Sequence, residues 1–150
     1  MNMVKPLHIF LADDDRDDVD LFGDTLHIIE PAILFDWASD GLQALQFLRQ
    51  HDAPDVIFLD LNMPMADGRK CLQAIKEDDR LKDVPVIMFT TSSFPTDVRE
   101  CLSLGAICFI TKPTDIIELR TVLRTVVDNA HSDIAGSLKQ LDTRVSIYYQ

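Results

Sequence analysis

Acidic, hydroxyl and ammonium side chains come directly after four short apolar runs of this 150-residue sequence. Aspartates occupy positions 13–15 after the first run and Asp60 follows another, while Thr90 and Lys112 follow two later runs. If the runs are strands of one parallel sheet, their carboxyl ends meet at one edge, where ligands bind in open α/β folds. The sequence therefore predicts one polar site assembled from four distant segments.

Two kinds of positive charge suit these carboxylates. Asp13, Asp14 and Asp60 would repel one another in a partly dehydrated cleft unless a cation lay among them. Mg²⁺ prefers such oxygen ligands and is bound through one or two carboxylates together with phosphate oxygens, and Lys112 adds a compact ammonium group. With the charge neutralised, a carboxylate can attack a phosphoryl group and form an acyl phosphate. Asp60 is the candidate nucleophile, and Mg²⁺ is the candidate cofactor.

Strand-length apolar runs alternate with segments of helical periodicity, which is the pattern of βα units around a parallel sheet. Strands are expected at residues 7–12, 33–38, 56–59, 84–89 and 106–111. Helices are expected between and after them, and the fifth helix begins after the N-cap residue Asp115. Its predicted buried face consists of Ile116, Leu119, Val122, Leu123, Val126 and Val127. The sequence thus predicts an α/β fold with a doubly wound parallel sheet.

Four motifs in this order resemble the receiver domains of two-component response regulators, of the single-domain type similar to the chemotaxis regulator. They are the segments 11–15 (LADDD), 58–68 (FLDLNMPMADG), 89–91 (FTT) and 109–113 (FITKP). The resemblance covers roughly residues 5–130. It implies a flavodoxin-like three-layer sandwich with a five-stranded parallel sheet of strand order 2-1-3-4-5.

The resemblance also implies roles for the acidic residues. Asp60 is expected to be the phospho-acceptor, and Asp14, Asp60 and the backbone carbonyl of Asn62 are expected to hold Mg²⁺. Asp13 is expected to contribute to the metal site through a bound water. Asp15 and Asp18 are interpreted as first-turn helix residues, which the helix dipole favours whatever the function.

Further roles fall at the ends of the fourth and fifth expected strands. The resemblance implies that Thr90 hydrogen-bonds the phosphoryl oxygens, that Lys112 pairs with them, and that Phe109 is an aromatic switch residue. Ser92 is expected to lie beside the path of an attacking water. The Lys112–Pro113 peptide bond is expected to be cis.

These features favour a signalling switch that takes a phosphoryl group from a sensor histidine kinase or a phosphotransfer protein and relays its state to a protein partner. Three alternatives remain open. A Mg²⁺-dependent phosphohydrolase of related fold would need a second carboxylate where this chain has Asn62. A flavodoxin-like FMN protein would need hydroxyl and backbone N–H groups where the first strand ends in carboxylates. A receiver-like interaction module would work without phosphorylation.

Composition narrows the possible partners and locations. A net charge of −11 disfavours binding to nucleic acid. No apolar run is long enough to cross a membrane, and residues 1–6 do not resemble a secretory signal, so a cytoplasmic location is expected. The three cysteines and four histidines show no spacing typical of a disulfide framework or a zinc site.

Residues 1–130 are predicted to form the receiver domain, and residues 131–150 an extension without a domain of its own. In the extension, Ile134, Leu138, Leu141 and Val145 have the spacing of one helical face, although Gly136 and the β-favouring run after residue 144 interrupt a continuous helix. This apolar stripe predicts that the extension either packs on its own domain or forms an interface, in a homodimer or with a protein partner.

Overall fold

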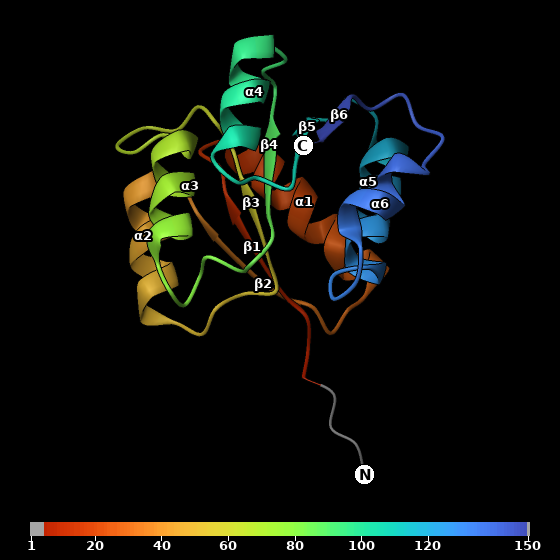
Figure 1. Ribbon diagram of the computed structural model, residues 1–150. Coiled ribbons are helices and arrows are strands. Elements are labelled where there is room, and N and C mark those ends of the chain that lie inside the picture. Colours follow the sequence, from red (N-terminus) through yellow and green to blue (C-terminus); the bar gives the residue numbers. More distant parts are fainter. Residues whose placement is uncertain (1–4, 150) are drawn as a thin grey trace.

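The computed structural model describes residues 5–149, and strands alternate with helices along most of this chain (Figure 1). The strands are β1 (His8–Ala12), β2 (Leu34–Ala38), β3 (Val56–Leu59), β4 (Val86–Thr90), β5 (Cys108–Thr111) and β6 (Ile147–Tyr149). The helices are α1 (Arg16–Ile29), α2 (Gly41–Gln50), α3 (Gly68–Glu77), α4 (Pro95–Ser103), α5 (Ile116–Asp128) and α6 (Ile134–Lys139).

The sheet has the order β2-β1-β3-β4-β5-β6. The first five strands are parallel, as predicted, in the order 2-1-3-4-5. The sequence did not predict β6, which pairs antiparallel with β5 and makes the sheet six-stranded. The flavodoxin-like fold is confirmed, with an added antiparallel strand at the β5 edge.

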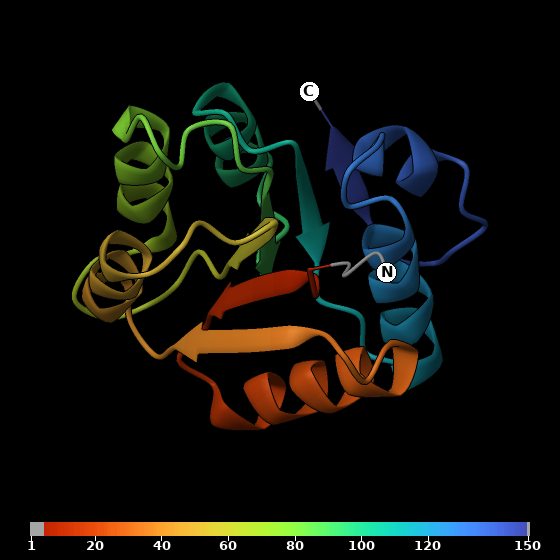
Figure 2. The same ribbon diagram turned by 90° about the horizontal axis from the view of Figure 1, so that it is seen from below.

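Helices cover both faces of the sheet (Figure 2), which makes three layers. Alternate strand residues point to opposite faces, so Phe10, Leu59 and Phe109 pack with α2, α3 and α4. Residues one position along, such as Leu11 and Ile110, pack with α1, α5 and α6. Burial on both faces explains why the strands are continuous apolar runs.

Aspartate caps fix where most helices begin. The side chains of Asp15, Asp40, Asp67, Asp115 and Asp133 each accept a hydrogen bond from a backbone N–H in the first turn of the helix that follows. The capping role predicted for Asp115 is therefore confirmed. Helix α4 differs, because its N-cap residue is a phenylalanine that makes no side-chain cap bond.

One predicted detail of the helices is wrong. Ile116 is expected on the buried face of the fifth helix, but it is the first helical residue and is 49% exposed.

The apolar stripe of the extension does not form one continuous helix, in agreement with the β-favouring run after residue 144. It forms α6, whose Ile134 and Leu138 are buried against α5, and then a loop that leads to β6. The extension packs on its own domain, which was one of the two predicted arrangements.

Within residues 5–149, no helix is long and apolar enough to cross a bilayer.

Candidate functional site

Backbone hydrogen bonds continue past the strand ends and place the polar residues. The N–H of Asp13 donates to the carbonyl of Ala38 over 3.0 Å, and the N–H of Asp60 donates to the carbonyl of Ala12 over 2.9 Å. On the other side of β3, the N–H of Lys112 donates to the carbonyl of Thr90 over 2.7 Å. These bonds extend the sheet register by one residue, so the side chains that follow the apolar runs meet at one edge.

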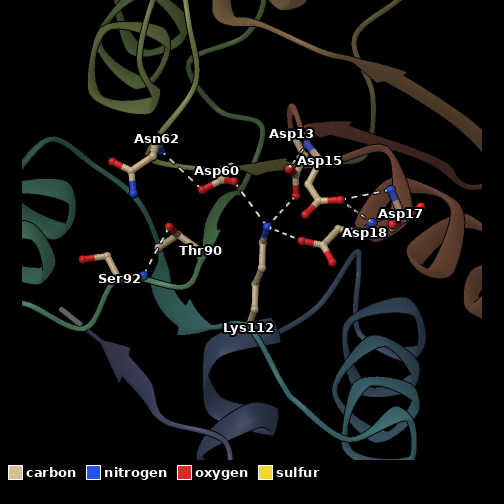
Figure 3. Close-up of polar contacts among 9 residues, drawn as sticks. All are labelled: Asp13, Asp15, Asp17, Asp18, Asp60, Asn62, Thr90, Ser92 and Lys112. Carbon is tan, nitrogen blue, oxygen red and sulfur yellow. Dashed lines mark hydrogen bonds and ion pairs between the residues drawn. The ribbon is translucent and has the colours of Figure 1, made fainter.

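Lys112 lies at the centre of this edge (Figure 3). Its Nζ atom is 2.8 Å from Asp13 Oδ2, 2.7 Å from Asp18 Oδ2 and 3.2 Å from Asp60 Oδ2. Burial alone would lower the pKa of Lys112, but hydrogen bonds to Asp13 and Asp18 and the charge of Asp60 outweigh burial and raise it. Lys112 therefore stays charged and partly neutralises a cluster of carboxylates.

Burial disfavours the ionised form of Asp13. Its side chain is buried, and burial raises its pKa from 3.8 to about 6 despite the nearby Lys112. Asp13 Oδ1 accepts the N–H of Asp15 over 2.9 Å, and Oδ2 pairs with the Lys112 ammonium at 2.8 Å. One ammonium does not use both lone pairs of a carboxylate oxygen, so Oδ2 can also face a divalent cation.

Three carboxylates have the geometry for such a cation. One oxygen from each of Asp13, Asp14 and Asp60 can be chosen so that all three lie within 4.8 Å of one another. Asp13 and Asp60 are buried and Asp14 is exposed, which leaves one side open to water. An all-oxygen set with an open side suits Mg²⁺, which retains several waters when it binds to proteins. The residues present thus fit a hard divalent cation.

The remaining predicted residues surround Asp60. The N–H of Asn62 donates to Asp60 Oδ1 over 3.3 Å, and the exposed Asn62 lies at the start of the loop after β3. Thr90 is fully buried, and its hydroxyl oxygen accepts the N–H of Ser92 over 3.4 Å. Phe109 is fully buried in the core beside α4, and its ring meets that of Tyr148 edge-on at 6.1 Å between centroids.

The structure corrects two expectations about Lys112. Asp18 was interpreted as a first-turn helix residue only, but its carboxylate also pairs with Lys112. Sequence reasoning missed this contact because 94 positions separate the two residues and the first-turn location already explained an acidic side chain. The expected cis Lys112–Pro113 bond is wrong, since all peptide bonds in residues 5–149 are trans. Trans is also the form that X–Pro bonds prefer.

The family model of the response regulator receiver domain matches residues 9–124. The chain belongs to the response-regulator receiver-domain family. That family consists of signalling domains, and the match includes every residue of the predicted site.

Curated relatives support this assignment over part of their length. The chain is 32% identical over 96 residues to the probable methanogenesis regulatory protein FilR2 of Methanothrix harundinacea, which covers 61% of this chain and 62% of that protein. It is 40% identical over 86 residues to response regulator Rcp1 of Synechocystis, which covers 53% of this chain and 58% of that protein. In both relatives the match spans less than two thirds of the protein.

Solved structures share the fold. The Mn²⁺-bound form of response regulator Rcp1 superposes with a TM-score of 0.73 at 32% identity, covering 81% of this chain and 91% of that one. The phosphorylated cyanobacterial phytochrome response regulator RcpA gives a TM-score of 0.77 at 32% identity, covering 83% and 93%. The chemotaxis protein in a CheX–CheY complex with BeF₃ and Mg²⁺ from Borrelia burgdorferi gives 0.70 at 30% identity, covering 82% and 89%.

Proposed function

We propose that Asp60 accepts a phosphoryl group from a phosphohistidine of a sensor histidine kinase or a phosphotransfer protein, and that the phosphorylated chain acts on a downstream protein. The observation that carries this proposal is the surroundings of Asp60. Its carboxylate lies 3.2 Å from the Lys112 ammonium and within reach of two further carboxylates that could share a divalent cation. Asp13 has the same neighbours, but its side chain is fully buried, whereas 9% of the Asp60 side chain is exposed and can meet a phosphoryl donor.

In the proposed step, an Asp60 carboxylate oxygen bonds to phosphorus while the P–N bond to the donor imidazole breaks. The leaving nitrogen keeps the bonding electrons and takes up a proton. Asp13, Asp14, Asp60 and the backbone carbonyl of Asn62 would hold Mg²⁺, which neutralises negative charge on the phosphoryl oxygens when bound. Mn²⁺ and Mg²⁺ in related receiver structures support this cofactor.

The two side chains beyond the carboxylates stabilise the added charge. Lys112 is already within 3.2 Å of Asp60, so a small movement of its flexible stem would pair it with the phosphoryl oxygens. The Thr90 hydroxyl would donate a hydrogen bond to them. Phe109 is proposed to change rotamer when Thr90 moves and so to pass this change to the surface formed by α4, β5 and α5. Slow hydrolysis of the acyl phosphate by the chain itself would then reset the switch.

The wider organisation is also proposed. Residues 1–130 form the receiver domain and residues 131–150 an extension. The family match to residues 9–124 supports the first part of this division. The packing of α6 against α5 supports the second, because the extension shares the core of the domain and has none of its own. The homodimer and the cytoplasmic location remain predictions, and the net charge of −11 supports protein partners over nucleic acid.

Acetyl phosphate with Mg²⁺ tests the central proposal. Intact-mass measurement should show one added phosphoryl group on the wild-type chain and none on Asp60→Asn. Asp40→Asn is the matched control, because Asp40 is a partly exposed helix cap and asparagine caps a helix equally well; it should gain the same mass as the wild type. Phosphorylation of Asp60→Asn, or failure of the wild type to gain mass, would overturn the assignment.

A further inference from the structure

Three side chains connect α3 to α4 beside the phosphorylation site. Arg69, in the first turn of α3, makes an ion pair through Nη2 with Asp97 Oδ1 in the first turn of α4. The Ser92 hydroxyl donates to the other oxygen of the same carboxylate, Asp97 Oδ2, over 2.6 Å. Arg69 and Asp97 are 26% and 19% exposed, so water screens this pair less than a surface ion pair. We call Arg69, Asp97 and Ser92 the α3–α4 link.

One end of the α3–α4 link reaches Thr90. The backbone N–H of Ser92 donates to the Thr90 hydroxyl oxygen over 3.4 Å, and Figure 3 shows the two residues joined by this bond on the Asp60 side of the site. A hydroxyl that accepts a hydrogen bond has its own proton available for another acceptor, and donation is strengthened by the bond it accepts. The position of Ser92 therefore influences how well Thr90 can donate.

The other end of the link reaches Asp60 through the backbone. Arg69 follows Gly68, whose N–H donates to the carbonyl of Leu61 over 2.9 Å. Gly68 packs so closely on the strand end that a Cβ atom there would lie 2.4 Å from the backbone oxygen of Asp60. The start of α3 is thus held against the backbone of Asp60. Because Arg69 lies in this first turn of α3, its contact with Asp97 restrains the position of Ser92 in the segment after β4.

The start of helix α4 has no side-chain cap, so its position depends more on the α3–α4 link than on a cap of its own. Its N-cap Phe94 supplies no side-chain cap, whereas the aspartate before each of the other five helices does so. Arg69 also lies 3.1 Å from Glu100 one turn further along α4, but Glu100 is 53% exposed. The Ser92 hydroxyl bonds Asp97, and the Thr111 hydroxyl donates to the Ser92 carbonyl over 3.4 Å. The Asp97 pair is thus the contact through which Arg69 influences where the segment 91–94 lies relative to Asp60.

We propose that Arg69 is a positioning residue, which acts through Asp97 and Ser92 to aim the Thr90 hydroxyl at a phosphoryl group on Asp60. The inference rests on the proposed function of Asp60. It adds a residue on α3 that contacts neither the phosphoryl group nor the cation. Loss of one aligned hydrogen bond to the phosphoryl group predicts a roughly threefold to tenfold weaker binding of a phosphoryl mimic.

Calorimetric titration of beryllofluoride into the Mg²⁺-loaded chain measures this effect. Arg69→Gln should bind beryllofluoride about threefold to tenfold more weakly than the wild type, while its affinity for Mg²⁺ alone stays unchanged, because the carboxylates are intact. Asp97→Asn is the second variant and should show a loss in the same range. Glu100→Gln is the matched control, since it removes the other partner of Arg69, and should bind like the wild type.

A Thr90→Ala background separates positioning from general support of the fold. Because Arg69 is proposed to act through Thr90, adding Arg69→Gln to Thr90→Ala should cause no further loss of beryllofluoride affinity. An equal loss in that background, a parallel loss of Mg²⁺ affinity, or wild-type binding by both link variants would overturn the proposal. Failure of the wild type itself to bind beryllofluoride would instead count against the function proposed for Asp60.

Discussion

Replacing Asp13 by asparagine should stabilise the metal-free chain at neutral pH. Burial holds the pKa of Asp13 at about 6, compared with 3.8 for the ordinary carboxyl group. At 1.36 kcal/mol per unit, this difference is a cost of about 3 kcal/mol for ionising Asp13 in the folded chain. Asparagine removes the charge and retains an oxygen for the N–H of Asp15. It cannot pair with Lys112, so the expected gain is about 1–3 kcal/mol.

The gain should depend on pH in a defined direction. Between pH 3.8 and about 6, Asp13 holds a proton in the folded chain but has lost it in the unfolded chain. The stability of the wild type therefore falls, through this group, as pH rises across that window. The asparagine of the variant does not titrate, so the two chains should have similar stability near pH 4 and differ most above about pH 6.

Urea unfolding in EDTA, followed by circular dichroism at several pH values, measures the difference. Asp40→Asn is the control, because it makes the same chemical change at a partly exposed helix cap. Saturating Mg²⁺ should reverse the order at neutral pH, since the wild type retains the oxygen that a cation would contact. A metal-free Asp13→Asn chain that is less stable than the wild type at pH 7 would refute the reasoning that burial dominates at this position.

Three further predictions concern the cation, the strand end and the extension. Asp14→Ala should weaken Mg²⁺ binding at least tenfold by calorimetry, with unchanged or higher metal-free stability, because it removes a like charge from the cluster; a marked fall in stability would give Asp14 a structural role. Gly68→Ala should lower the free energy of unfolding by about 1–3 kcal/mol, because the new Cβ meets the Asp60 backbone; unchanged urea unfolding would contradict this. Deleting residues 132–150 should lower the melting temperature without changing the number of chains per particle seen by light scattering, because α6 buries Ile134 and Leu138 on the same chain; a dimer that becomes a monomer would show instead that the extension forms an interface.

Local patterns predicted the fold well where the pattern and the burial agree. The run at 56–59 became β3 with its predicted bounds, because a strand buried on both faces is a continuous apolar run. The expected strand at 84–89 begins two residues late, at Val86, since Pro85 has no N–H for the ladder. The β-favouring run after residue 144 contains β6, but its antiparallel pairing with β5 was not predicted, because three residues are too few to specify a partner strand.

The site residues that could be predicted were also those that a local pattern marks. Asp13, Asp14, Asp60 and Lys112 were predicted because each directly follows an apolar run and strand order brings the run ends together. The pairing of Lys112 with Asp18 and that of Arg69 with Asp97 join side chains from different elements. Such contacts depend on how helices sit on the sheet, which no local pattern specifies.

The antiparallel strand β6 limits how a protein partner can bind at the β5 edge of the sheet. Residues 108–110 pair with residues 147–149, so the outer backbone groups of β5 already have hydrogen-bond partners from the same chain. A peptide that bound here by β-augmentation would first have to displace the C-terminal segment. Partners that leave the segment in place would contact the side chains of α4, α5 and β6 or pair with the outer edge of the three-residue β6. Within residues 5–149, the other edge strand is β2, which has five residues and carries the exposed Leu34 and Trp37.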